Sequence, residues 1–190
     1  MTLPANSKMK KSKKRVFFMA NPLYQMALFL YLVYVLIKLM KVYLASDHAG
    51  FELKNGIKKY LQSEGYDLED LGNLAYNPED DYPEFISKAA EKISVSPEEF
   101  AIVFGKSGAG EAMVADKFKN VRCAQGFSRE NVRLAREHNN ANVLSLGSLF
   151  IDLETAKGLV DEFLKTAFSG ESRHIRRLEE ITKIEQKNYA

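Results

Sequence analysis

Short apolar runs alternate with longer segments of helical spacing from Met40 to the end of the chain. Strand-like runs are expected at 41–46, 66–71, 101–104, 121–124 and 142–146. The segments between and after them place apolar residues three and four apart, and a last charged helix is expected from about Ser172 to Gln186. This alternation predicts an α/β fold: a Rossmann-like, doubly wound parallel five-stranded sheet in three α/β/α layers.

The seven residues Gly105–Glu111 join the third strand-like run to a helical pattern. A strand, a glycine loop and a helix start collect free backbone N–H groups, which suit an anion. Glu111 is expected on the first helical residue, beside those donors. Donors next to a carboxylate suit proton abstraction beside a carbonyl, where an enediolate oxygen must be stabilised. The alternative is a tight turn whose glycines serve backbone geometry alone.

Two better-known glycine motifs do not fit the spacing of this loop. A P-loop requires glycine five residues before the Gly-Lys-Ser, where this chain has Phe100. A dinucleotide fingerprint requires a third glycine at the position of Met113. The loop therefore indicates neither of those two ligand classes.

Charge and the scarcity of cysteine and histidine exclude further classes of function. The chain has 27 basic and 25 acidic residues, and a net charge of +2 gives no nucleic-acid signal. Cys123 is the single cysteine, which excludes an internal disulfide and fits a reducing, cytoplasmic location. Three histidines and one cysteine do not resemble a zinc site, so no metal is predicted.

Residues 1–39 differ in composition from the rest of the chain. Six basic residues lie between Lys8 and Arg15, and residues 16–37 then run for 22 positions without a charge. That length is sufficient for a membrane span, and the basic run before it resembles a signal anchor. We favour a native start at Met40, with residues 1–39 outside the working protein and 40–190 as its one domain. A membrane segment at 16–37 is the alternative.

Four separated segments carry polar residues that core packing does not require. They lie at residues 46–50, 105–111, 136–142 and 173–177. The first two follow predicted strands, so both should reach the carboxyl edge of the sheet, where ligands bind in such folds. Each segment also has a structural explanation. Asp47 would cap a helix, His138 and Asn139 would end one, and the arginines would form a solvated face.

Together and in this order, these segments resemble the ribose-5-phosphate isomerase B / galactose-6-phosphate isomerase family of sugar-phosphate isomerases. The resemblance runs from Met40 to the C-terminus. Its pieces are Ser-Asp-His-Ala-Gly at 46–50, Asp-Tyr-Pro at 81–83, the glycine loop, Ala-Asp-Lys at 115–117, Arg-Glu-His-Asn-Asn-Ala-Asn at 136–142 and Arg-His-x-x-Arg at 173–177. In one branch of that family the base is a cysteine at the position of Gly105. This chain resembles the other branch, whose glutamate base matches Glu111.

The resemblance implies aldose–ketose isomerisation through a cis-enediolate, without metal or organic cofactor. Glu111 would move the proton between C1 and C2 of the sugar. His138 would open the furanose ring, assisted by Ser107 or Asp47. Backbone N–H groups of the glycine loop and the Asn139 amide would hold the oxyanion, and two arginines would hold the phosphate. The substrate-binding residues would be Asp47, His48, Lys106, Ser107, Gly108, Ala109, Gly110, Asn139, Arg173 and Arg177.

The resemblance further implies a homodimer or homotetramer with shared active sites, acting on ribose 5-phosphate. Another sugar phosphate (galactose 6-phosphate, allose 6-phosphate or a tetrose phosphate) is the nearest alternative. Lys106 bears on that preference, because a small residue is more usual there in this branch. A non-catalytic sugar-phosphate binding module and a membrane-anchored structural protein are alternatives from other classes. The presence of both an acid and a base candidate, His138 and Glu111, argues against pure binding.

Overall fold

The structure is a computed structural model that describes residues 22–189, and the chain divides into two compact units, 1–38 and 39–190. Helix α2 spans Pro22–Leu39. Among residues 22–189, no helix combines the length and the apolar character needed to cross a membrane. The basic run at 8–15 and the uncharged residues 16–21 lie outside the described residues. That residues 1–39 lie outside the working enzyme stays a prediction.

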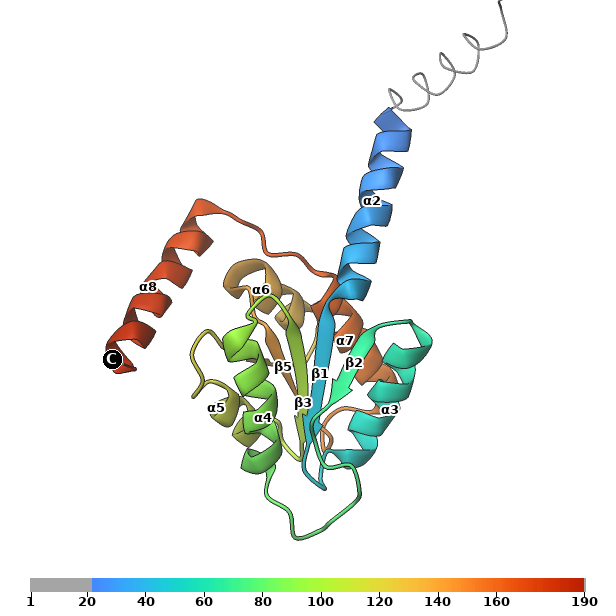
Figure 1. Cartoon of the computed structure of the whole chain (residues 1–190), viewed down its shortest axis with the longest axis vertical. Coiled ribbons are helices and arrows are strands. Elements are labelled where there is room, and N and C mark those ends of the chain that lie inside the picture. Colours follow the sequence, from blue (N-terminus) through green and yellow to red (C-terminus); the bar gives the residue numbers. More distant parts are fainter. Residues whose placement is uncertain (1–21, 190) are drawn as a thin grey trace, which may run out of the picture. The chain divides into compact units, whose positions relative to one another are not determined.

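One parallel sheet forms the centre of the second unit, with its strands in the order β2-β1-β3-β5-β4 (Figure 1). The predicted five-stranded parallel sheet is therefore confirmed. The fourth strand begins two residues later than expected, because Val121 donates its N–H to Phe118 in the turn after α5. The strands are β1 Lys41–Ser46, β2 Asp67–Asp70, β3 Phe100–Gly105, β4 Cys123–Gln125 and β5 Val143–Gly147.

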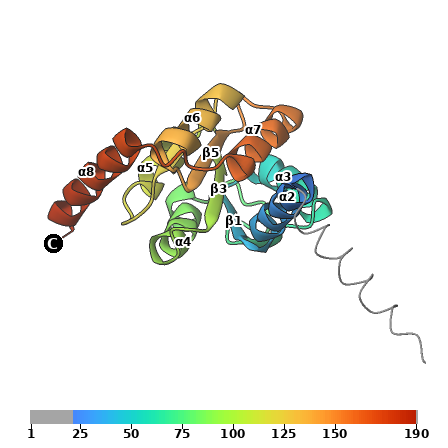
Figure 2. The same cartoon turned by 90° about the horizontal axis from the view of Figure 1, so that it is seen from above.

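Helices cover both faces of this sheet, as the alternation predicts (Figure 2). Helices α4 and α5 pack together on one face, and α3, α6 and α7 pack on the other. Side-chain caps form at two of them: the side chains of Ser128 and Asp152 accept backbone N–H groups at the starts of α6 and α7. The helices are α3 Phe51–Ser63, α4 Tyr82–Val95, α5 Ala109–Ala115, α6 Arg129–Asn139, α7 Leu153–Lys165 and α8 Ser172–Asn188.

The three central strands are buried almost throughout, because helices cover both of their faces. On one face, Tyr43, Ala45 and Val103 pack against Ile86 and Ile93 of α4. The strand residues that alternate with these, such as Leu44 and Ile102, face the other layer of helices and have no exposed surface. The central strands thus form a rigid base for the loops at their carboxyl ends.

The chain reverses its winding direction between β1 and β3. Strand β1 continues into α3 on one face, whereas β3 continues into α5 on the other face. In open α/β sheets, the crevice at the carboxyl ends of two such strands is the usual ligand site. The residues that follow β1 are Asp47 and His48, and the residues that follow β3 form the glycine loop. Both segments therefore reach this edge, as the sequence predicts.

Candidate active site

Carbonyl groups of the glycine loop accept hydrogen bonds from β5 and from the residues that follow it. The N–H groups of Ser148 and Leu149 donate to the carbonyls of Gly105 and Lys106, at 2.9 and 3.0 Å. The buried Ser145 hydroxyl donates to the Gly108 carbonyl at 2.7 Å. Gly108 itself has a φ of +80°, in the region that favours glycine. The loop is therefore fixed with its carbonyls turned toward β5.

Several backbone N–H groups of the loop remain without a partner in the described part of the protein. Within residues 22–189, the N–H groups of Lys106, Ser107 and Gly110 donate to no protein acceptor, whereas that of Ala109 donates to the Ser107 hydroxyl at 3.3 Å. The Lys106 and Ser107 side chains are exposed. Three of the backbone donors are thus available to an anion, and backbone N–H groups are the donors that stabilise oxyanions in many enzymes.

Glu111 is the third residue of α5, not the first as the sequence suggested, because the helix already begins at Ala109. Glu111 is only 4% exposed, and its Oε2 atom has no hydrogen-bond partner among residues 22–189. Burial raises the pKa of the Glu111 carboxyl group, and the nearby Asp47 carboxylate raises it further, against the lowering effect of the N–H groups of Glu111 and Gly108. A buried, unpartnered carboxyl group with a raised pKa is suited to act as a general base.

Gly105 leaves the space that the Glu111 carboxyl group fills. A Cβ atom built on Gly105 would lie 1.6 Å from Oε1 of Glu111, far inside any allowed contact. A side chain at position 105 and the observed position of the glutamate therefore exclude one another.

His48 is held by an acidic residue that the sequence analysis did not identify. Its ring Nδ1 lies 2.7 Å from Oδ1 of Asp80, and its backbone N–H donates to the same oxygen at 2.9 Å. The hydrogen bond to Asp80 raises the pKa of the His48 imidazole. Asp80 lies 32 residues along the chain, in the polar loop after β2. Nothing in the acidic run Glu79–Asp81 distinguishes which of its members would pair with a histidine.

Asp47, His48 and Asp80 also offer three potential metal-ligand atoms within 4.8 Å of one another. All three of these groups already have hydrogen-bonding roles. Asp80 accepts from His48 and from the Asn73 amide, and Asp47 accepts the Gly50 N–H at 3.1 Å. Hydrogen bonding within the protein therefore accounts for the cluster. The absence of a metal cofactor stays a prediction.

Two further predicted site residues, His138 and Asn139, end helix α6. This helix follows the carboxyl end of β4 and leads back to the amino end of β5, so its last residues lie at the amino edge of the sheet. The His138 ring packs 4.2 Å, between centroids, from the ring of His174, which is 1% exposed. His174 in turn has its Nδ1 atom 2.7 Å from the Ser169 hydroxyl. One chain therefore does not bring His138 to Glu111.

Arg173 and Arg177 lie on α8, four residues apart as predicted, and both are exposed. Arg173 pairs with Glu171 at 2.8 Å. The predicted set is thus divided between two edges of the sheet. The carboxyl edge holds Asp47, His48, Lys106, Ser107, Gly108, Ala109, Gly110 and Glu111, while the other group contains His138, Asn139, Arg173 and Arg177.

Comparison with known proteins gives consistent matches over the second unit. The profile of the Ribose/Galactose Isomerase family matches residues 42–181. A protein of Mycolicibacterium paratuberculosis named ribose-5-phosphate isomerase B is 41% identical over 80% of this chain and 95% of its own length. The Escherichia coli protein of the same name is 34% identical over 77% of this chain and 97% of its own.

Solved structures show the same relationship. Ribose-5-phosphate isomerase B from Mycoplasma genitalium, solved with bound ribulose 5-phosphate, superposes with a TM-score of 0.74 at 37% identity, over 77% of this chain and 96% of that one. The Clostridium thermocellum enzyme superposes with a TM-score of 0.74 at 38% identity, over 80% and 100% of the two chains. These matches agree with the doubly wound α/β fold.

Proposed function

We propose that this protein, which belongs to the ribose/galactose isomerase family, interconverts ribose 5-phosphate and ribulose 5-phosphate. The observation that carries the proposal is the buried Glu111 carboxyl group, which fills the space beside Gly105 and whose Oε2 atom finds no hydrogen-bond partner among the described residues. Burying such a group lowers stability, and a chemical role explains why the chain keeps it. Its neighbours, the free N–H groups of the glycine loop, match the charge that enolisation creates.

In the proposed reaction, Glu111 removes the proton from C2 of the open-chain aldose and returns it to C1, while the hydroxyl proton on O2 passes to O1. The developing enediolate oxygen accepts hydrogen bonds from the glycine loop, and a donor of this kind is typically worth ~3–4 kcal/mol. Asp47, whose carboxylate acts on the pKa of Glu111, and Ser107 of the glycine loop assist ring opening. The raised pKa of the Glu111 carboxyl group favours removal of the proton from C2, because a carboxylate of higher pKa is a stronger base.

The acid that opens the ring, His138, is proposed to come from a second copy of the chain. A shared site is supported by the position of His138 and Asn139 at the amino edge, while Glu111 lies at the carboxyl edge. Apolar side chains are exposed on three loops at the carboxyl edge, where a partner would cover them. These are Leu74 and Tyr76 after β2, Phe127 after β4, and Leu149 and Phe150 after β5.

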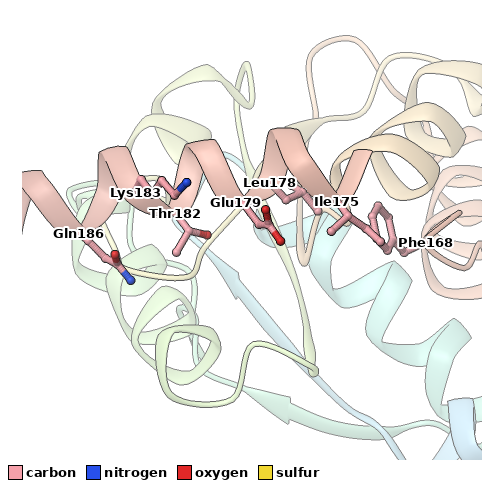
Figure 3. Close-up of a pocket in the computed structure, with 7 residues that line it drawn as sticks. All are labelled: Phe168, Ile175, Leu178, Glu179, Thr182, Lys183 and Gln186. Carbon is pink, nitrogen blue, oxygen red and sulfur yellow. The ribbon is translucent and has the colours of Figure 1, made fainter. Parts of the chain in front are cut away.

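Helix α8 supports the same proposal. Figure 3 shows an open groove along one side of this helix, where Phe168, Ile175 and Leu178 lie together. Ile181 and Ile184 are also exposed on α8. An isologous dimer would cover such surfaces and bring the α8 arginines to a phosphate in a completed site. We therefore propose a homodimer, or a tetramer built from two such dimers.

Mixing two inactive variants tests the shared site directly. If Glu111 and His138 serve one site from different chains, then a heterodimer of Glu111→Gln and His138→Asn contains one intact site. Random mixing of equal amounts by reversible dissociation should restore about a quarter of the parent activity. Mixtures that stay inactive, although mass spectrometry detects the heterodimer, would show that both residues act within one chain.

A substrate panel tests the activity itself. The purified chain should convert ribose 5-phosphate faster than allose 6-phosphate, galactose 6-phosphate or a tetrose phosphate in a coupled assay. In D₂O, an isomerase should also introduce deuterium at C2 of recovered substrate. A sugar-phosphate binding module would bind the same compounds with neither turnover nor exchange.

The proposed enzyme is residues 40–190. Supporting observations are the unit boundary at 38/39, the family match that begins at residue 42, and the near-complete coverage of the relatives by this segment. We also propose that it works in the cytoplasm, where its charged substrates are retained. A chain beginning at Met40 should fold and keep full turnover. Loss of folding on that truncation would assign residues 1–39 a structural role.

A further inference from the structure

His48 is connected to the protein interior by a continuous set of hydrogen bonds. Asp80, which binds the His48 ring and backbone through Oδ1, accepts the Asn73 amide through its other oxygen. Asn73 is buried and is held at its backbone, since its N–H donates to the Ser46 carbonyl at 3.1 Å. The position of the Asp80 carboxylate is thus determined on both sides.

Lys54 of α3 forms the inner end of this set. Its ammonium group has no exposed surface, donates to the Asn73 carbonyl at 2.7 Å and pairs with Asp70 at 2.7 Å. Lys58 pairs with the other oxygen of Asp70 at 2.8 Å. The bonds of Lys54 to Asp70 and to the Asn73 carbonyl therefore fix the backbone at Asn73, whose side-chain amide donates to Asp80.

Packing alone does not account for a buried lysine at this position. The inward face of α3 is otherwise apolar, with Leu53, Ile57 and Leu61. A buried ion pair of this type is often no more stabilising than an apolar residue of similar volume. Burial also lowers the pKa of the Lys54 ammonium, so keeping this group charged in the interior costs free energy. What the cluster supplies is a defined position for Asn73 and, through it, for Asp80.

We propose that Asp80 is a positioning residue, which holds His48 as a cationic ligand for the substrate phosphate, and that Lys54 and Asn73 hold Asp80 in place. This proposal rests on the proposed function, because it names the group that His48 binds. Asp80 occupies Nδ1 of the imidazole and leaves Nε2 without an acceptor in the described part of the chain. A doubly protonated ring then directs a charge-assisted N–H toward an incoming phosphate.

The groups around His48 define the direction of its titration. They are the carboxylates of Asp80 and Asp47, and the Tyr76 ring, which meets the imidazole edge to face at 6.4 Å. Both carboxylates raise the pKa of His48, while burial opposes them. The imidazolium therefore persists to higher pH than an ordinary histidine, and phosphate affinity should fall as pH rises through the raised pKa.

The first experiment is an NMR titration of the three imidazoles in the full-length protein, with His48→Gln used for assignment. The pKa of His48 should lie above the ordinary value of about 6.5 and rise further with saturating inorganic phosphate. In Asp80→Asn it should fall toward that ordinary value. A His48 that titrates at or below about 6.5 in the parent protein overturns the proposal, even if the variant does not fold.

The second experiment compares steady-state kinetics of Asp80→Asn with those of Asp81→Asn. The control removes the same charge one residue away, from an exposed side chain that makes no hydrogen bond at the start of α4. We expect KM for ribose 5-phosphate to rise about tenfold in Asp80→Asn, the loss of one charge-assisted bond, with kcat nearly unchanged. In Asp80→Asn, the rise in KM with increasing pH should also begin at a lower pH than in the parent protein. Equal KM–pH profiles in the two variants would contradict the proposal.

Lys54→Met tests the inner part of the cluster. It should raise KM in the same direction as Asp80→Asn, by a smaller factor, and lower the pKa of His48. A loss of thermal stability with an unchanged His48 titration would show that Lys54 has only a structural role. The NMR measurement needs no turnover. If the protein fails to isomerise ribose 5-phosphate, the proposed function fails, while the His48–Asp80 pairing is still decided.

Discussion

Two ionisable side chains, Glu111 beside the glycine loop and Arg136 near the end of α6, are 4% and 6% exposed. Their surroundings are opposite in kind. The Arg136 guanidinium donates to the Thr166 carbonyl at 3.1 Å and to the Asn140 side chain at 3.0 Å, and it lies 4.8 Å from the Phe100 ring centre. The Glu111 Oε2 atom, by contrast, has no hydrogen-bond partner in the described part of the chain.

This difference separates a structural role from a chemical one. Burial lowers the pKa of Arg136 to about 10, yet its bonds and stacked rings keep it charged at neutral pH. Burial raises the pKa of Glu111, and nothing compensates for the loss of solvent at Oε2. A satisfied buried charge holds elements together, whereas an unsatisfied one is ready to accept a proton from a ligand. Substitutions at the two edges should therefore have separable effects.

The largest effect is expected from Glu111→Gln, which keeps the size of the side chain but removes the proton acceptor. Turnover should fall by at least ~10²-fold, the lower range for a general base, while KM changes little. Cys123→Ser is the matched control, because burial raises the pKa of that thiol and leaves it protonated. Its kcat should stay within a few-fold of the parent. An essential Cys123 with a dispensable Glu111 would overturn the assignment of the base.

The same variant should be more stable than the parent at neutral and alkaline pH. The folded-state pKa of Glu111 is raised, so the parent is most stable while the carboxyl is protonated. That contribution is present below the unfolded-state pKa and is lost as pH rises through the raised folded-state value. Thermal unfolding curves should therefore converge in acid and separate as pH increases. A parent that stays more stable than Glu111→Gln at pH 8 would show that the carboxylate is satisfied.

The next effect is expected from Gly105→Ala, in which the new Cβ displaces the Glu111 carboxyl group. Turnover should fall by roughly 10- to 100-fold, because displacement of a catalytic group by about 1 Å has that consequence. Gly65→Ala is the control. It strains a residue with a φ of +79° and open space around it, so stability should fall while kcat is unchanged. Equal kcat losses in both variants would mean that Gly105 matters only for folding.

A moderate effect is expected when Arg173 or Arg177 is replaced by alanine. Both side chains are exposed, so stability should change little. If both bind the phosphate equally in the ground and transition states, KM should rise about tenfold or more while kcat is nearly retained. Arg176→Ala on the same helix is the control. Unchanged KM in both variants would leave the arginines as a solvated face.

The smallest effect on turnover is expected from Arg136→Met, although its effect on stability should be large. The variant leaves the Thr166 carbonyl and the Asn140 amide without their partner, at a cost of about 2–4 kcal/mol in the free energy of unfolding. Chemical denaturation measures that loss, and kcat per folded molecule should stay near the parent value. Lost turnover with unchanged stability would give Arg136 a functional role.

Periodicity and turn chemistry were sufficient to predict most of the fold. Each predicted strand and helix after Met40 forms close to its expected position, because apolar spacing is a local property that the packed sheet then satisfies. The fourth strand begins later than expected because the Val121 N–H donates to the Phe118 carbonyl in a turn and not to a neighbouring strand. The glycine loop and the Asp47–His48 segment could likewise be assigned to one edge, because the carboxyl ends of parallel strands coincide.

The amino-acid sequence by itself determined the parallel α/β layout and the chemical nature of the loops. The tertiary structure decided which loop side chains meet: Glu111 fills the space left by Gly105, Asp80 rather than its acidic neighbours binds His48, and His138 lies at the other edge. The physical reason is distance along the chain. Helix and strand preferences act over a few residues. These pairings depend instead on the strand order and on the hydrogen bonds that each loop makes with segments distant in the sequence.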